Sequence, residues 1–163
     1  MSNIFLKYFS FLYGERAPFK NPFASGGFFG LSAYHTKFHI LRASYEGIAL
    51  SLLDCYNYLP QIYSKVYISG GGSESNILCQ MVADCLGKPV IRLLSKELGI
   101  DGIVKTLKVG LGYIKEFSSI HDDSQTVFMP DRICNQKYKQ LYKLFIEIQK
   151  KMEGFWENRL KIV

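Results

Sequence analysis

Hydrophobic residues recur at helical spacing in two long segments of the chain. Across residues 34–59 an apolar residue returns at every third or fourth position, and Pro60 follows directly. This period predicts a long helix that turns one face to a core and ends at the proline. A second apolar stripe over residues 135–156 predicts a terminal helix docked on the body, with lysines largely on its other side: Lys137, Lys139, Lys143, Lys150 and Lys151.

Two short runs of β-forming residues lie between these helices. The run VYI at 66–68 ends abruptly in glycines, and KPVIRL at 88–93 is a second such run. A helix is predicted between them over residues 73–86, with Gly87 as its C-cap. The alternation of helices and strands places the chain in the α/β class, and two recognisable strands make only part of a sheet domain.

The remaining segments are less regular. Residues 97–117 follow a helical pattern but contain four glycines, each of which weakens a helix by about 1 kcal/mol unless close packing compensates. We therefore expect this helix to be pressed against a neighbouring element. The whole chain, 1–163, is predicted to be one partial domain: a loop arm over 1–33 that ends in the strand-like FFGL, an α/β body over 34–117, and a polar connector with the terminal helix over 118–163.

Composition limits the classes of function. With 163 residues and 48% hydrophobic residues the chain can bury a core. Its formal charge of +6 permits nucleic acid or an anionic ligand as a partner, although lysines on a helix more often form its solvated face. The apolar N-terminal stretch is interrupted by Lys7 and is far shorter than the roughly 20 residues of a membrane span. We expect neither nucleic acid nor a membrane as a partner.

The four cysteines indicate a reducing compartment. None forms a CxxC pair, and each lies in an apolar helical pattern, where a thiol behaves as a small hydrophobic group. We therefore expect a cytoplasmic protein without a disulfide or a zinc site.

The glycines after the first strand are the strongest candidate for a binding site. The sequence ISGGGSESN leads from a strand into a helix. The first N–H groups of a helix lack partners within the helix and attract anions, and glycines let a ligand approach the backbone. The pattern lacks GxGxxG and GK[ST], which excludes a Rossmann turn or a Walker P-loop. On the pattern alone, a purely structural turn with Ser73 as N-cap is as good an interpretation.

Three motifs in the same order resemble the FGGY family of carbohydrate kinases. The segment GGFFGLSAYHTKFHILRASYE at 26–46 looks like the C-terminal signature of that family. Upstream, LYGERAP at 12–18 resembles the GER[TA]P element of xylulokinases and gluconokinases. Downstream, the chain matches the run GGGxxSxxxxQxxADxLG through Gly70, Gly71, Gly72, Ser75, Gln80, Ala83, Asp84 and Gly87.

The resemblance implies a fold and a site. It indicates part of a ribonuclease H-like domain of the actin-like ATPase fold, the second half of an FGGY kinase, in which ATP lies between two domains and a sugar hydroxyl attacks the γ-phosphoryl group. The glycine turn would be the adenosine motif. The nucleotide-binding residues it implies are Gly70, Gly71, Gly72, Ser73, Ser75 and Asn76. The general base, both phosphate loops, most sugar contacts and the Mg²⁺ would lie in the preceding part of such kinases, so we expect no catalytic residue and no metal ligand in this chain.

The resulting interpretation is the C-terminal, nucleotide-binding part of an ATP-dependent sugar kinase, with a pentulose or gluconate favoured by the GERAP element. The isolated chain is expected to be inactive and to form a homo-oligomer. The alternative is a degenerate remnant that serves as a nucleotide-binding or dimerising module, and a nucleic-acid-binding domain would be supported by charge alone. One departure from the family is the sequence GIDGIV at 99–104, where relatives carry small residues as in GALGAA.

Other polar clusters are weaker candidates. Adjacent residues such as His121, Asp122 and Asp123 rarely converge on one metal ion. Glu15 is expected to anchor its loop, with Arg16, rather than to contact a substrate. His35 and His39 are one helical turn apart, which would suit a metal, but capping or packing at the start of the helix is the favoured interpretation.

Overall fold

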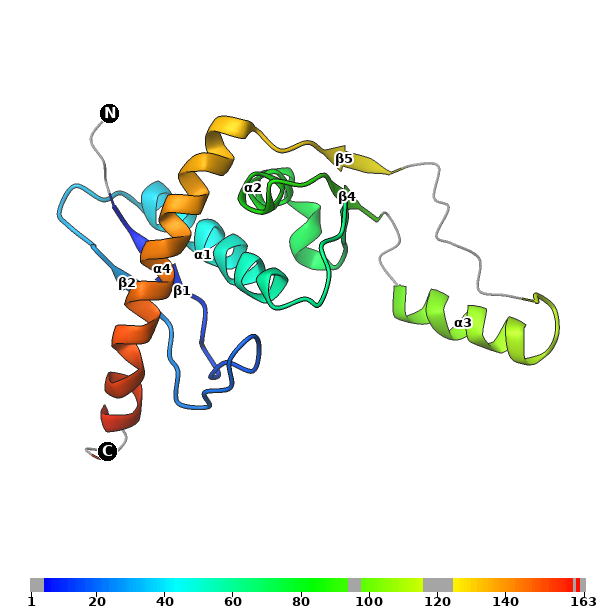
Figure 1. Ribbon diagram of the computed structural model, residues 1–163, viewed down its shortest axis with the longest axis horizontal. Coiled ribbons are helices and arrows are strands. Elements are labelled where there is room, and N and C mark those ends of the chain that lie inside the picture. Colours follow the sequence, from blue (N-terminus) through cyan, green and yellow to red (C-terminus); the bar gives the residue numbers. More distant parts are fainter. Residues whose placement is uncertain (1–4, 94–97, 116–124, 160, 162–163) are drawn as a thin grey trace.

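Three helices and two small sheets form the body of the part of the chain that the structure describes. The computed structural model describes residues 5–93, 98–115, 125–159 and 161. In chain order the elements are β1 (Lys7–Phe9), β2 (Gly27–Phe29), α1 (Lys37–Asn57), β3 (Val66–Ile68), the 3-10 helix η1 (Gly71–Glu74), α2 (Asn76–Leu86), β4 (Val90–Arg92), α3 (Leu98–Gly110), β5 (Thr126–Phe128) and α4 (Arg132–Arg159) (Figure 1).

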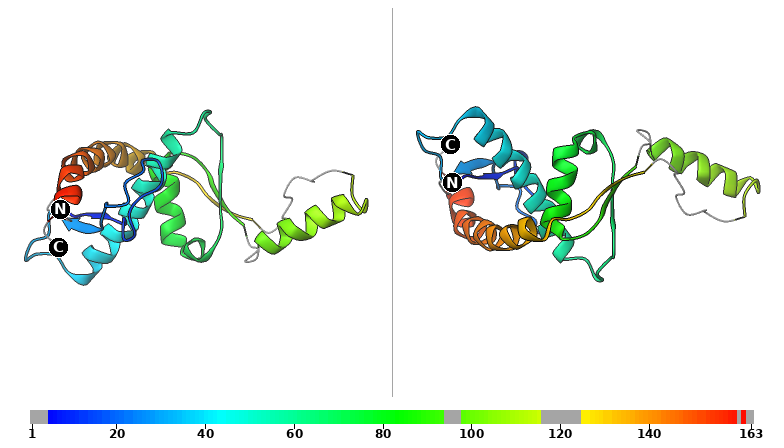
Figure 2. Two further views of the ribbon diagram at one scale, coloured as in Figure 1. Left: turned by 90° about the horizontal axis from the view of Figure 1, so that it is seen from below. Right: turned by 90° about the horizontal axis from the view of Figure 1, so that it is seen from above.

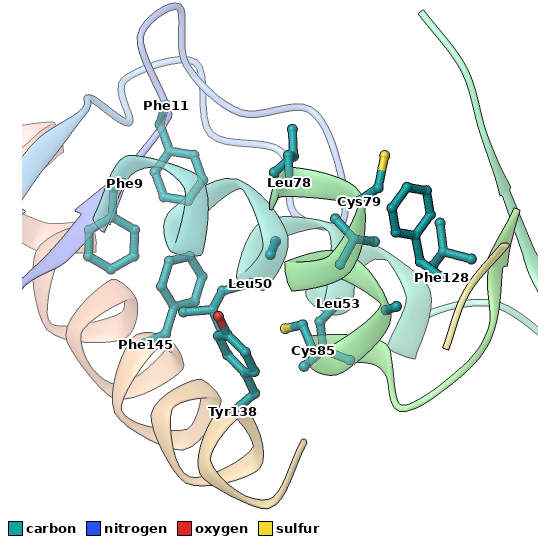
Figure 3. Packing of buried hydrophobic residues seen from close by; sticks show 14 of the residues in the cluster. Phe9, Phe11, Leu50, Leu53, Leu78, Cys79, Cys85, Phe128, Tyr138 and Phe145 are labelled. Carbon is teal, nitrogen blue, oxygen red and sulfur yellow. The ribbon is translucent and has the colours of Figure 1, made fainter. Parts of the chain in front are cut away.

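The main core lies where α1, α2 and α4 meet β1. Figure 3 shows Leu50 of α1, Cys85 of α2 and Phe145 of α4 turned toward one another. The ring of Phe145 stacks on Phe9 of β1, with ring centroids 4.5 Å apart. These contacts confirm the apolar stripe of α4 as its buried face, because aromatic and aliphatic side chains leave water together at this junction. For α1 the predicted face was wrong. The stripe through Phe38, Leu41 and Leu52 is exposed, and α1 instead buries a neighbouring face that carries Ala43, Leu50 and Leu53. The five lysines on the other side of α4 are exposed, as expected.

The N-terminal arm contains a two-stranded antiparallel sheet, in which β2 overlaps the expected strand-like FFGL, whereas the sequence did not predict β1. Lys7 is paired with Phe29 and Tyr8 with Phe28. The Nζ atom of Lys7 lies 2.9 Å from an Oε2 atom of Glu46 in α1, and both side chains are buried. A buried charge needs such a partner. The ion pair therefore fixes the arm to α1.

The second sheet has the order β3-β4-β5. Strands β3 and β4 are parallel, and β5 is antiparallel to β4. Both expected strands are therefore present, while β5 lies in the segment expected to be a polar connector. Its three residues are too few to show an alternating pattern.

The ends of α2 and α4 are set by polar side chains. Ser75 is the N-cap of α2, since its hydroxyl accepts a hydrogen bond from Leu78 N. The expected start of the helix at Ser73 is thus three residues early, because η1 intervenes. Gly87 is confirmed as the C-cap, with a left-handed φ of 66°. Helix α4 begins three residues earlier than expected, where Asp131 accepts a hydrogen bond from Cys134 N.

Among the residues that the structure describes, no element is pressed against helix α3, so this expectation was wrong. A Cβ atom built at Gly99, Gly102 or Gly110 would meet nothing within 4 Å. The helix extends away from the body in all views (Figure 1 and Figure 2). Its glycines are compatible with a helix held by its own backbone hydrogen bonds, and four of its apolar side chains are exposed: Ile100, Ile103, Val104 and Leu107.

Candidate nucleotide-binding site

The glycine turn lies at the carboxyl end of β3. Gly70 has φ 86° and ψ 179°, a conformation that favours glycine. A Cβ atom at Gly70 or Gly71 would meet nothing within 4 Å, and all three glycines of the turn are exposed. An open stretch of backbone therefore leads into η1, whose first N–H groups lack partners within the helix.

The two serines of the turn have their hydroxyl groups engaged inside the protein. Ser73 is buried, and its hydroxyl donates to the carbonyl of Gly70 over 2.7 Å. Ser75 is half-buried and caps α2. These bonds give both side chains a role in shaping the turn. A contact between either serine and a nucleotide stays a prediction.

Asn76 is the site residue with an exposed side chain, and it is held by an arginine. Its Oδ1 atom accepts a hydrogen bond from Nη1 of Arg92 over 2.7 Å. The same Nη1 lies 3.3 Å from the carbonyl oxygen of Ser73, and Nη2 donates to Thr126 Oγ1 over 3.2 Å. Arg92 thus connects the end of β4 with the start of α2 and with β5.

Sequence reasoning missed Arg92. A signal was available, because residues that follow or end neighbouring parallel strands meet at one edge of a sheet. Arg92 ends β4 as the glycine turn ends β3. Its partner Asn76 lies 16 positions earlier in the chain, and the sequence alone does not show that contact.

Gln80 and Asp84 of the glycine-containing run connect α2 to the segment before α4. Gln80 donates to Asp84 Oδ1 and to the carbonyl of Met129, each over 2.8 Å. The backbone N–H of Asp131 donates to the same carboxylate oxygen over 2.8 Å. Their hydrogen bonds make these residues structural in the described chain.

A hollow of about 520 Å³ adjoins the site at Asn76. It runs along α2 toward α1 and α4, and both apolar side chains, such as Ile77 and Met81, and charged ones, such as Arg42, line it. None of the three glycines contributes to its lining. The open backbone of the turn is therefore a separate surface.

The weaker candidates have structural roles where the structure describes them. His39 accepts a hydrogen bond from Thr36 N over 3.0 Å at the start of α1, which confirms the capping interpretation. Glu15 accepts from the backbone N–H of Arg16 and Ala17 and so anchors its own loop. His121, Asp122 and Asp123 lie outside the described residues.

Two further findings concern metals and membranes. Within the described ranges, no group of three or more His, Cys, Asp or Glu side chains could hold a metal ion. The same part of the chain contains no helix with the length and apolar character needed to cross a bilayer.

Comparison with known proteins identifies the family. Residues 3–107 match the model for the C-terminal domain of the FGGY family of carbohydrate kinases. The chain belongs to this family. The three motifs therefore predicted the family correctly, and the matched part of the chain includes the glycine turn and Arg92.

FGGY kinases of several kinds are similar to the chain. It is 29% identical to the L-xylulose/3-keto-L-gulonate kinase of Escherichia coli K12 over 156 residues, which are 92% of this chain and 31% of that protein. It is 30% identical to the gluconokinase of Bacillus licheniformis, covering 91% of this chain and 30% of that protein. The chain thus spans about a third of the length of these relatives.

Solved structures support the predicted fold class. The xylulose kinase of Rhodospirillum rubrum matches 93% of the chain with a TM-score of 0.77 and 26% identity, over 31% of its own length. A ligand-bound xylulose kinase of Lactobacillus acidophilus matches 94% of the chain with a TM-score of 0.82 and 24% identity, over 32% of its length. The chain has the mixed α/β architecture of part of an FGGY sugar kinase, within the actin-like ATPase fold.

Proposed function

We propose that this chain is the nucleotide-binding, C-terminal part of an ATP-dependent kinase that phosphorylates a hydroxyl group of a small sugar or polyol. The observation that carries the proposal is the open backbone at Gly70 and Gly71, where an added Cβ atom would meet nothing within 4 Å. A nucleotide can approach this backbone closely, because no side chain covers it. The substrate class follows from relatives that are named xylulose kinase and gluconokinase.

The chain's own contribution would be positioning. Phosphoryl transfer requires aligned reactants and neutralised charge, and a clamp on the adenosine part of ATP supplies alignment without taking part in the chemistry. As the family resemblance implies, Mg²⁺, the general base and most sugar contacts would belong to the remaining two thirds of such a kinase.

By itself the chain is expected to bind ADP or ATP weakly and to transfer no phosphate. Without a general base nothing accepts the proton of the sugar hydroxyl, and without the phosphate loops the transferred group keeps its charge. A coupled kinase assay over a panel of pentuloses, gluconate and glycerol tests this point. Turnover of any of these by the purified chain would contradict it.

A non-catalytic module is the second candidate, and the exposed apolar residues of α3 favour it. Strand β3 is an edge strand of its sheet, and Leu107 and Ile103 of α3 are 57% and 62% exposed. Such surfaces promote association. We propose that a second copy of the chain covers them in a cytoplasmic homodimer, which sedimentation of the purified chain tests. A monomer at tens of micromolar would rule out this dimer.

A further inference from the structure

Arg92 determines which end of the Asn76 amide is available to a ligand. The guanidinium group carries hydrogen-bond donors and no acceptor. The amide of Asn76 must therefore turn its oxygen toward Arg92, as the 2.7 Å contact between Nη1 and Oδ1 shows. The amide NH₂ group of this exposed residue is then left for another partner.

The position of Arg92 is itself fixed from several sides. Its guanidinium carbon lies 5.5 Å from the ring centroid of Phe128, over the ring face, and Nη2 donates to Thr126. Both contacts come from β5. Nε is buried and makes no hydrogen bond to the described residues. A buried donor without a partner costs stability, and the two contacts from β5 offset that cost.

We propose that Arg92 is a positioning residue, which holds the Asn76 amide so that its NH₂ group donates a hydrogen bond to a ring nitrogen of a bound purine. The inference rests on the proposed nucleotide-binding function and names the group that reads the base. Ring nitrogens such as N3 and N7 of adenine are acceptors and fit an amide donor. An amide free to rotate would present its oxygen half of the time and would bind the base less well.

Two variants separate positioning from charge. Arg92→Lys keeps the positive charge but replaces the planar fork by a single ammonium group, which cannot hold Asn76, Ser73 and Thr126 in one geometry. Asn76→Asp keeps a partner for Arg92 but removes the NH₂ group. Lys65→Met is the matched control, because it removes an exposed positive charge next to β3 without touching Asn76.

The experiment measures the Asn76 side chain and the ligand separately in the full chain. Side-chain amide NMR reports whether the NH₂ group is ordered without any ligand, and titration with ADP and with uncharged adenosine reports binding. We expect an ordered NH₂ group in the natural chain and a mobile one in Arg92→Lys. Affinity for both ligands should fall about 5-fold in Arg92→Lys and about 10-fold in Asn76→Asp, as for loss of one directed hydrogen bond, and stay unchanged for adenosine in Lys65→Met.

The outcomes distinguish the inference from the proposed function. An Asn76 amide that is mobile in the natural chain, or unchanged ADP affinity in Arg92→Lys or in Asn76→Asp, overturns the positioning role while nucleotide binding stands. If the natural chain binds neither ADP nor adenosine, the proposed function fails and the inference fails with it. The inference is supported if the Asn76 NH₂ group is ordered in the natural chain and mobile in Arg92→Lys, and if both variants bind ADP and adenosine more weakly.

Discussion

Replacing Gly47 by alanine is predicted to destabilise the protein, although Gly47 lies in the middle of α1. A helix normally gains about 1 kcal/mol from this substitution. Here a Cβ atom would overlap the backbone carbonyl oxygen of Tyr8 and lie 3.1 Å from its ring carbon Cδ1. The close approach of β1 to α1 therefore requires glycine at this position.

The size of this destabilisation depends on whether the atoms around the added methyl group can move away. Inserting a methyl group into a filled space costs roughly 1–3 kcal/mol, and the upper part of this range applies because a backbone oxygen cannot rotate away. Tyr8 is also held by its pairing with Phe28 and by the neighbouring ion pair of Lys7. After the helical gain is subtracted, the free energy of unfolding should fall by about 1–2 kcal/mol.

Gly154 in α4 offers a matched control, because a Cβ atom there would meet nothing within 4 Å. Gly154→Ala should raise the free energy of unfolding by up to about 1 kcal/mol. The free energy of unfolding of both variants can be measured by urea unfolding monitored through tryptophan fluorescence. Trp156 is the single tryptophan and is buried, so its fluorescence reports the loss of the core. The reasoning is refuted if Gly47→Ala stabilises the protein as Gly154→Ala does.

Three further predictions concern buried polar groups. Lys7→Met should lower the free energy of unfolding by up to about 3 kcal/mol in urea, since it leaves Glu46 with the more exposed Arg42 as its remaining ion-pair partner, and a variant as stable as the natural chain would contradict this. Burial raises the pKa of the Cys85 thiol to about 12, so this thiol should resist a thiol reagent at pH 8 until the protein is unfolded, and rapid labelling in the folded protein would refute this. Burial also raises the pKa of Asp54 above its usual 3.8, against the opposing hydrogen bond from Tyr142, so ionised Asp54 costs stability once the pH rises through its folded pKa. Asp54→Asn should therefore gain stability relative to the natural chain as the pH is raised from about 4 to 7, and a difference independent of pH would contradict this.

The sequence predicted where the helices of the body lie, because their apolar residues recur over enough positions to show a period. It assigned the wrong face of α1 to the core, because the small residues that pack there, such as Ala43 and Ala49, carry a weaker signal than the exposed Phe38 and Leu41. Helix α1 covers Lys37–Asn57, within the expected 34–59, and the core of α4 lies on the predicted face. Strands β1 and β5 were missed because three residues carry no period. Their stability comes from pairing with distant segments and from contacts such as that between Lys7 and Glu46, 39 positions apart.

The site was predicted in part for a similar reason. Consecutive glycines between a strand and a helix are a local signal, and the structure places them in an open turn. The orientation of Asn76 depends on Arg92, whose role is created by the pairing of β3 with β4 and is invisible in either segment alone. The error over α3 has a different origin, because glycines show that a close neighbour can be accommodated and not that one is present.

Calorimetric titration with ADP tests the central claim most directly, using the natural chain, Gly71→Val and Gly154→Val. Gly71 has open space at its Cβ position, so valine should leave the fold intact and obstruct the approach of a nucleotide to the backbone. Gly154→Val adds the same side chain in open space on α4, away from the turn. The account predicts weak binding of ADP by the natural chain and by Gly154→Val, and none by folded Gly71→Val. Equal binding by all three proteins, or no binding by the natural chain, would contradict it.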